Sequence, residues 1–537
     1  MKPFNGRLTV RLRLLGPVAV LCVALAGLLG GCGGSSTTTS TAVSAASPAG
    51  QASGVQGNEL TFANSQAPGN LNPALTDIGP YEVYMALAYD SLTYVAPNGS
   101  VAPRLATSWH YVGRNNTEFQ LTIRQGARFS DGEPVTADAV ANSIEYFSGA
   151  HGPSSSVLAN LKSVIATGDN VLVTMKSPSP DLPELFSQKG TPGAIIAPAG
   201  VKNPRQLGNR TLGAGPYVLD AAATVAGSTY TYTPNPDYWD KSAVHWRKIV
   251  VKVFSTPTAA FQALQTGSVQ AMLVDPSAAA QLDASLYTVV SSPAQQLFIN
   301  IADKYGKVVP ALGKVQVRQA MNYALDRTAI AKSLYVNYGQ ATDQIQGPGY
   351  GGYQEQLESA YPYDVSEAKR LLAQAGYPHG FTFTVIEPPG MPSNALEAVT
   401  QEWAQVGINA KIEATTSPAQ FIAAWASGRT PAMIAQNTFN EPFLEWEQLL
   451  NPMAPLNVTH YQDPKVTALV ASAAAETDQP KANQIWDQVF QTIVKDAWNV
   501  SIVDSDVVYF MDKNIAPDVG QGDRMILSPR DLAPATG

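Results

Sequence analysis

The segment between Asp364 and Gln436 places the strongest constraint on the fold, because helical and strand patterns alternate along it. Apolar residues spaced as on one helix face follow Asp364, a capping-box residue with Glu367, and they stop at Gly376. The same reading predicts strands at 381–385, 408–414 and 432–436, and helices at 396–406 and 418–426. Strands and helices that alternate at short spacing are typical of a parallel α/β layer.

Two apolar strand patterns, at 296–301 and 500–510, flank the block that contains this layer. A pair of strands that brackets an inserted region is what a hinge between two lobes requires. About 480 residues follow Glu59, and a single hydrophobic core rarely grows that large. The sequence therefore predicts an α/β protein with two or three lobes.

The first residues of the chain have the pattern of an export signal. A basic start precedes an apolar, uncharged run from Leu14 to Leu29, which is too short for a comfortable membrane span. The segment Leu29-Gly-Gly-Cys32 resembles the lipobox of bacterial lipoproteins, which implies cleavage before Cys32 and a diacylglycerol on its sulfur. The alternative is an ordinary cleavage site with an incidental cysteine. The basic residues are Lys2, Arg7, Arg11 and Arg13.

A charge-free stretch rich in Gly, Ser, Thr and Ala follows Cys32. Because such a composition cannot form a core, we predict a flexible tether over 32–58 after a signal peptide over 1–31. Removal of four basic residues would change the net charge from −8 to −12, which argues against nucleic acid as a partner. The chain has two cysteines, so cleavage would leave only Cys32, and no disulfide or cysteine-based site is expected.

Motifs for catalysis are missing from the sequence. It contains no Gly-x-Ser-x-Gly, no His-Glu-x-x-His, no Walker A and no calcium-binding loop pattern, and its five histidines lack metal-ligand spacing. The run Gly347-Pro-Gly-Tyr-Gly-Gly352 fits Gly-x-Gly-x-x-Gly, but it lacks a preceding strand and a following helix, so we interpret it as a loop. We predict that the protein is not an enzyme and has no metal or cofactor.

Six segments in the same order resemble conserved motifs of the extracellular solute-binding proteins, family 5, which serve importers of peptides, nickel and related solutes. Substitutions within them are Ala214 for Thr, Leu325 for Ile and Gln374 for Glu, and Gln270 stands where the family usually has Asp. The segments are Val101–Trp109, Phe119–Thr136, Gly213–Tyr217, Asn235–Trp239, Val317–Arg327 and Glu367–Pro378.

The resemblance implies a two-lobe fold like that of periplasmic binding proteins, in the class with an extra subdomain and with the ligand enclosed between lobes. Lobe I would cover 59–300, with the extra subdomain at about 102–211. Lobe II would cover 301–507, and 508–537 would return to lobe I. The resemblance also implies a receptor subunit of an ABC importer that works outside the cytoplasm, with a permease and an ATPase as partners. We expect a monomer, anchored to the membrane through Cys32.

The ligand-binding residues are expected in a segment where peptide-binding members carry an Asp for the ligand's α-ammonium. Thr438 stands at the aligned position, so Glu441 or Glu445 takes this role, or the ligand lacks a free amine, or the alignment is shifted. Three functions remain open: capture of peptides, capture of an oligosaccharide, metal complex or cofactor, and hydrolysis by a secreted lipoprotein. The candidate ligand-binding residues are Tyr81, Trp425, Asn437, Thr438, Phe439, Asn440 and Glu441.

Overall fold

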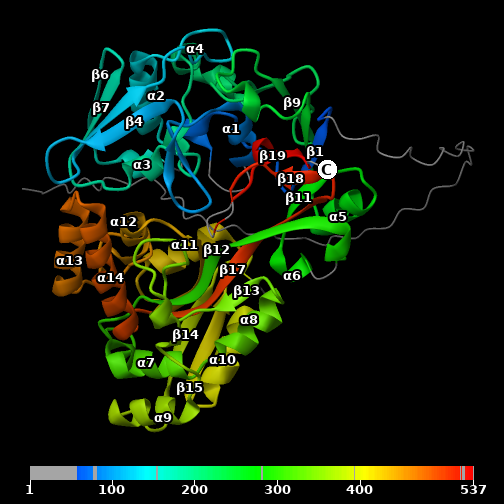
Figure 1. The fold of residues 1–537 in the computed structure, drawn as a ribbon. Helices are drawn as coiled ribbons and strands as arrows, with labels where there is room; N and C mark the ends of the chain where they lie inside the picture. The colour runs from blue at the N-terminus through cyan, green and yellow to red at the C-terminus, as the bar shows by residue number, and fades with distance from the viewer. Residues whose placement is uncertain are drawn as a thin grey trace, which may run out of the picture.

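Two lobes joined by a pair of long strands make up the described part of the protein (Figure 1). The structure is a computed structural model that describes residues 57–76, 82–152, 155–279, 282–391, 394–520, 522 and 526–535. Lobe I, the upper half of Figure 1, holds the N-terminal elements and the C-terminal end, and lobe II holds the elements between the two long strands. No helix among the described residues is both long and apolar enough to cross a membrane.

A long mixed sheet runs through both lobes in the order β15-β14-β16-β12-β17-β11-β1-β10-β9-β8, and β13 pairs with β17. The strands β12 and β17 pair antiparallel along their length, from Tyr287 opposite Asp512 to Asn300 opposite Asn499. They contain the two predicted apolar strands and carry the connection between the lobes. The strands are β15 (Ile408–Ala414), β14 (Phe381–Glu387), β16 (Ala432–Thr438), β12 (Tyr287–Ile301), β17 (Asn499–Asp512), β11 (Ala271–Val274), β1 (Leu60–Asn64), β10 (Ile249–Val253), β9 (Thr229–Pro234), β8 (Tyr217–Leu219) and β13 (Gly339–Ala341).

Lobe II contains the predicted parallel layer. β14 pairs parallel with both β15 and β16, and helices cover these strands. The cap of the first helix differs from the prediction: Asp364 accepts the N–H of Glu367, but the Glu367 carboxylate binds Arg370, one turn further on. The helices of this lobe are α7 (Val315–Tyr323), α8 (Arg327–Tyr335), α9 (Val365–Gln374), α10 (Ala395–Ala404), α11 (Pro418–Ala426), α12 (Pro442–Glu445), α13 (Pro464–Ala475) and α14 (Gln479–Lys495), with a π-helical turn, η9 (Trp446–Leu450), after α12.

Lobe I contains a second, antiparallel sheet in the order β4-β5-β7-β6, which packs against α2 and lies within the range 102–211. The predicted lobe boundaries at residues 300 and 507 fall inside β12 and β17, and they stay a prediction. The further elements are α1 (Glu82–Ala88), α2 (Ala137–Gly149), α3 (Leu182–Leu185), α4 (Pro198–Lys202), α5 (Pro257–Gln265), α6 (Pro276–Ala279), η1 (Pro73–Leu75), η3 (Thr191–Gly193), η10 (Pro529–Asp531), β2 (Thr93–Val95), β3 (Val101–Pro103), β4 (Ala106–Tyr111), β5 (Glu118–Ile123), β6 (Leu161–Thr167), β7 (Asn170–Met175), β18 (Ile515–Pro517) and β19 (Leu532–Pro534).

Several motif residues hold the lobe I scaffold through a buried carboxylate. Asp90 is fully buried and accepts hydrogen bonds from Trp239 Nε1 (2.9 Å), the Tyr238 hydroxyl (3.1 Å) and Arg530 Nη1 (3.3 Å). Burial opposes ionisation, but the charges of Arg530 and Arg104 and the two donors hold the Asp90 pKa below its usual value. The Asn235–Trp239 motif is therefore structural here.

The two arginines of the Val317–Arg327 motif are structural in the same sense. Arg318 donates to the carbonyls of Ala497, Leu312 and Asp496 at 2.8–2.9 Å, and Arg327 donates to the carbonyl of Ser501 at 2.7 Å. Both therefore fix the helices that follow β12 against the start of β17. Because buried carbonyls need partners, this motif stabilises lobe II.

Candidate functional site

The predicted ligand-binding segment 437–441 connects β16 to α12, at the contact between the lobes. Asn437 and Thr438 still pair with Gln296 and Gln295 on β12, and the chain leaves the sheet after Thr438. Just beyond them, the N–H of Leu444 in α12 donates to Asp181 Oδ2 of lobe I at 2.8 Å. In Figure 1, α12 lies directly below α3, which Asp181 precedes. The segment therefore faces the other lobe, as a cleft-lining segment must.

An aromatic pair supports this segment from lobe II. Phe439 packs on Tyr350 with ring centroids 5.7 Å apart, and Lys189 of lobe I lies 5.5 Å from the Tyr350 ring centroid. The glycines of the 347–352 loop allow this packing, because a Cβ on Gly347 would lie 2.5 Å from the Phe439 ring. The 347–352 loop, predicted from the sequence, therefore packs against the candidate ligand-binding segment.

A buried carboxyl group lies beside the same segment. Glu445 is only 3% exposed, and its Oε2 accepts a hydrogen bond from Asn440 Nδ2 at 3.1 Å. Burial raises the pKa of Glu445 to about 7, and the hydrogen bond from Asn440 only partly opposes this rise. A cationic group placed nearby would favour the ionised form, so Glu445 is suited to hold an amine.

A buried side-chain amide also lies beside the segment 437–441. Gln346 is fully buried and donates to the carbonyls of Gly351 (2.8 Å) and Asn440 (3.4 Å). Its Oε1 has no hydrogen-bond partner among the described residues. Since buried polar atoms are usually paired, this oxygen can accept a hydrogen bond from an N–H or O–H group of a solute.

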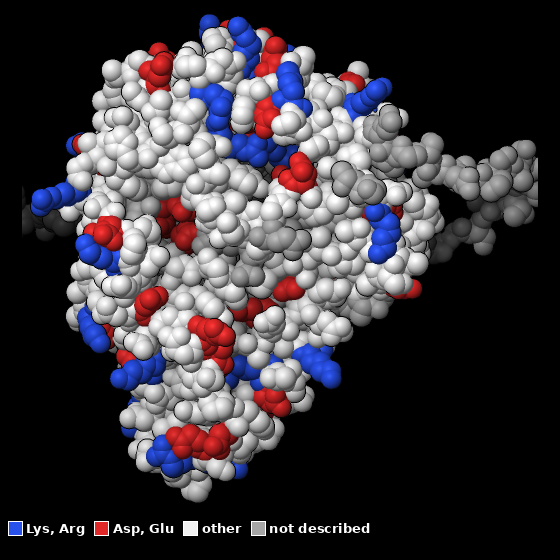
Figure 2. All heavy atoms as spheres, in the orientation of Figure 1, with Lys and Arg blue, Asp and Glu red and all other residues white. Residues whose placement is uncertain are grey.

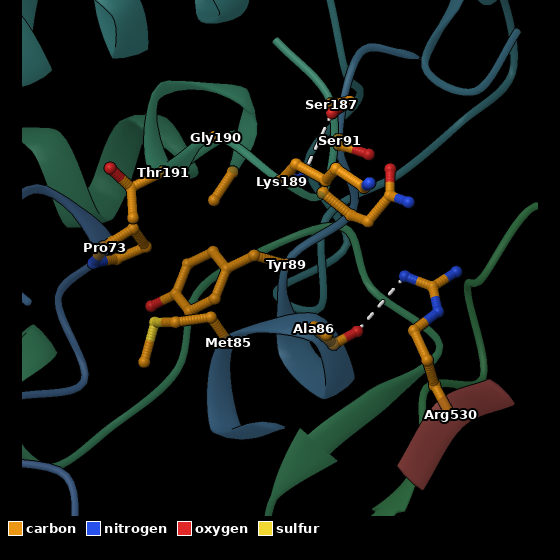
Figure 3. A pocket seen from close by; sticks show the side chains of 12 residues that line it. Pro73, Met85, Ala86, Tyr89, Ser91, Ser187, Lys189, Gly190, Thr191 and Arg530 are labelled. Carbon is orange, nitrogen blue, oxygen red and sulfur yellow. Dashed lines mark hydrogen bonds between the residues drawn. The ribbon is translucent and has the colours of Figure 1, made fainter. Parts of the chain in front are cut away.

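On the lobe I side, a small cavity of about 40 Å³ lies between α1, the segment 187–191 and Arg530 (Figure 3). Tyr89 and Thr191 line it, and Lys189, which touches Tyr350 of lobe II, stands at its edge. Ligand pockets are commonly several hundred Å³ in volume. This lobe I cavity alone is therefore too small to hold a peptide-sized solute.

The predicted ligand-binding residues differ in how accessible they are. Thr438 is exposed and Asn437, Asn440 and Glu441 are partly exposed, so these four lie where a solute can reach them. Trp425, by contrast, is 2% exposed in the core of lobe II, where its Nε1 donates to the Pro455 carbonyl at 3.2 Å, so no free ring face lines the cleft. Tyr81 and Cys32 lie outside the described residues. No group of three potential metal ligands occurs among the residues that the structure describes.

Two residues of the lobe contact were missed by sequence reasoning. Asp181 looks like the start of a short helix, and nothing in its neighbourhood signals a contact with a residue 263 positions away. Lys189 lies in an irregular segment without a motif. The Gly-rich run at 347–352 was a usable signal, because repeated glycines mark close approach of another segment.

Two α/β lobes connected by a strand pair, with polar residues at their contact, define a protein that encloses a solute between its lobes. The chain belongs to the family described as bacterial extracellular solute-binding proteins, family 5, whose model matches residues 100–448. It is accordingly a solute-binding protein of an ABC importer and works outside the cytoplasm with transporter partners.

Relatives and solved structures agree with this assignment. The chain is 26% identical to heme-binding protein A of Haemophilus influenzae over 399 residues, which is 67% of this chain and 70% of the relative. It is 24% identical to a glutathione-binding protein of Salmonella typhi over 436 residues, or 76% of this chain and 83% of the relative. Both relatives are named as binding proteins.

The fold matches those of HbpA2 from Haemophilus parasuis (TM-score 0.77, 22% identity, 89% of this chain and 100% of the other) and DppA from Helicobacter pylori in complex with a peptide (TM-score 0.71, 21% identity, 89% and 98%). These structures confirm the predicted two-lobe α/β fold.

Proposed function

We propose that this protein captures a small solute with a free amine, a short peptide in the first instance, and delivers it to a membrane permease. The observation that carries the proposal is the buried Glu445 carboxyl beside Asn440, at the end of the candidate ligand-binding segment. A carboxylate there can compensate a ligand ammonium, which the Thr438 side chain cannot do. Beside this carboxylate, Gln346 Oε1 can accept a hydrogen bond from the solute and Asn437 Nδ2 can donate one, since neither has a hydrogen-bond partner among the described residues.

Printed ligands of similar proteins support a solute of this kind. The DppA structure contains a peptide, and glutathione, named for one group of relatives, is itself a small peptide with a free amine. Heme and nickel complexes are also named for similar proteins, so a non-peptide solute is the alternative. Native mass spectrometry of the protein purified from its own organism identifies the solute directly: a peptide mass supports the proposal, and a sugar, cofactor or metal complex replaces it.

Substitution of the acids tests the amine anchor. We expect Glu445→Gln to weaken binding of a free-amine peptide at least tenfold, because loss of a buried charge partner costs more than about 2 kcal/mol. The same peptide with an acetylated amine should bind equally well to the wild type and to the Glu445→Gln variant. Glu441→Gln shows whether the neighbouring acid contributes, and Glu413→Gln, on an exposed edge strand, is the matched control.

Titration calorimetry measures all three variants. If Glu445→Gln and Glu441→Gln both retain wild-type affinity for the free-amine peptide, neither acid anchors the ammonium.

We further propose that Cys32 carries a lipid and that the protein acts as a monomer anchored to the cell membrane, in the periplasmic or cell-envelope space. The sequence Leu29-Gly-Gly-Cys32 and the charge-free segment after it support this arrangement. Cys32→Ser should move the protein from the membrane fraction to the soluble fraction on cell fractionation. Unchanged membrane association of the variant would contradict a lipid on this residue.

A further inference from the structure

The contact between α3 and α12 places a partly exposed carboxyl group of lobe I against lobe II. Asp181 Oδ2 accepts the N–H of Leu444 at 2.8 Å. On the lobe I side, Tyr111 of β4 covers the contact: its hydroxyl accepts the N–H of Leu182 at 3.3 Å and donates to the Ser179 carbonyl at 2.6 Å. Because Leu444 belongs to lobe II, the environment of Asp181 depends on whether the lobes are together.

The groups that face Asp181 from the neighbouring elements are acidic. Glu184 comes from α3 itself, Glu441 from the start of α12 and Glu447 from η9. Figure 2 shows acidic side chains within the hollow where the upper and lower halves meet. Burial is the first cause that raises the pKa of Asp181 well above its usual value, the three acids add to it, and the Leu444 N–H opposes it.

We propose that Asp181 is a proton-linked latch: closure of the lobes moves its carboxyl from water into this acidic contact, and the carboxyl binds a proton as the lobes close. The proposal rests on the lobe closure of the proposed function, but it does not depend on which solute is bound.

The direction of the pH effect follows from linkage. With the lobes apart, the Asp181 carboxyl loses its contacts with lobe II and the nearby Glu441 and Glu447 and meets more water, so its pKa is lower than with the lobes together. With the lobes together its pKa is higher, so between the two values the closed form holds more protons than the open form. Closure is therefore favoured as the pH falls, and the closed-to-open ratio changes by up to about tenfold per pH unit for one proton.

Small-angle X-ray scattering of the intact chain, dialysed free of solute, tests this at about pH 5 and about pH 8. We expect the wild type to have a smaller radius of gyration at the lower pH. Asp181→Asn, which keeps the shape of the side chain without its charge, should have the smaller radius at both pH values. The control Asp131→Asn, at an exposed turn, should follow the wild type.

A second variant keeps the test decisive if Asp181→Asn does not fold. Glu447→Gln removes one of the acids that act on Asp181, so it should close more readily at the higher pH than the wild type does. A wild-type radius that is independent of pH overturns the proposal, and so does an Asp181→Asn variant that keeps the wild-type pH dependence. Since no solute is added, either result leaves the capture of an amine untouched.

Discussion

Asp90 is a buried and Asp181 a partly buried carboxyl group of lobe I, and their surroundings differ. Asp90 receives its compensation inside the lobe, from Arg530 and two aromatic donors. Asp181 receives an N–H from the other lobe and faces three acids. The pKa of the first is lowered and that of the second is raised. Removal of one partner from a buried pair within one rigid unit destabilises that unit, whereas a carboxyl group among like charges at a moving contact makes the motion sensitive to charge.

Removal of Arg530, the cation beside Asp90, should have the largest effect on the free energy of unfolding. Arg530→Met leaves Asp90 buried beside two hydrogen-bond donors but without its nearest positive charge, and loss of one partner of a buried ion pair costs about 3–5 kcal/mol. We expect a clear fall in the urea concentration at the unfolding midpoint, followed by tryptophan fluorescence.

Arg210→Met, at an exposed position of the same lobe, is the control and should unfold as the wild type does. Equal midpoints for the two variants would show that Arg530 does not compensate Asp90, and the contrast with Asp181 would lose its basis.

Lobe II offers a buried cation for the same comparison. Lys304 is 7% exposed and donates to the Ile301 carbonyl, and its Nζ lies 5.6 Å and 5.8 Å from the rings of Tyr461 and Trp498. Burial, with a smaller contribution from the charge of Arg318, lowers the pKa of Lys304 to about 7. In the unfolded chain the group titrates near 10.4.

Between these two values the unfolded state binds the additional proton, so Lys304 makes the free energy of unfolding rise with pH by up to about 1.4 kcal/mol per unit. Lys304→Met should remove this slope, which urea unfolding at pH values from about 7 to about 9 measures. Lys307→Met, on an exposed neighbour, should retain it. The interpretation is wrong if the two variants keep the same slope.

Local sequence patterns were sufficient for most of the lobe II layer. The strands predicted at 381–385, 408–414 and 432–436 are β14, β15 and β16, and their parallel pairing follows from the helices between them. Helical spacing also indicates that Trp425 belongs to the core and not to the cleft. Phe421 and Trp425 lie four residues apart on one face of α11, and both are buried.

The candidate site was predictable only in part. Its lobe II segment, 437–441, came from the resemblance to a family, because strand patterns end there and loops carry no periodic signal. Asp181 could not be found in this way. Its contact with Leu444 joins residues 263 positions apart, and no local pattern encodes which surfaces of two lobes will meet.

The smallest expected effect concerns a neutral contact between the lobes. Asn116 of lobe I is 2% exposed, and its Nδ2 donates to the carbonyls of Ala474 (2.9 Å) and Glu476 (2.8 Å) at the end of α13. Asn116→Asp replaces the donor by a carboxylate, which two carbonyl oxygens and the negative end of a helix repel.

Because this contact exists only with the lobes together, we expect the closed form to lose population and the affinity for the solute to fall by about tenfold, which corresponds to about 1.4 kcal/mol. The adjacent Asn115→Asp, exposed and likewise at positive φ (73° against 49°), is a matched control and should bind as the wild type does. Calorimetric affinities that are equal for the two variants would mean that Asn116 does not report closure. An Asn116→Asp variant can instead bind more weakly without a change in its unfolding midpoint. This result would show that the contact acts on closure and not on folding. The same distinction separates Asp181 from Asp90.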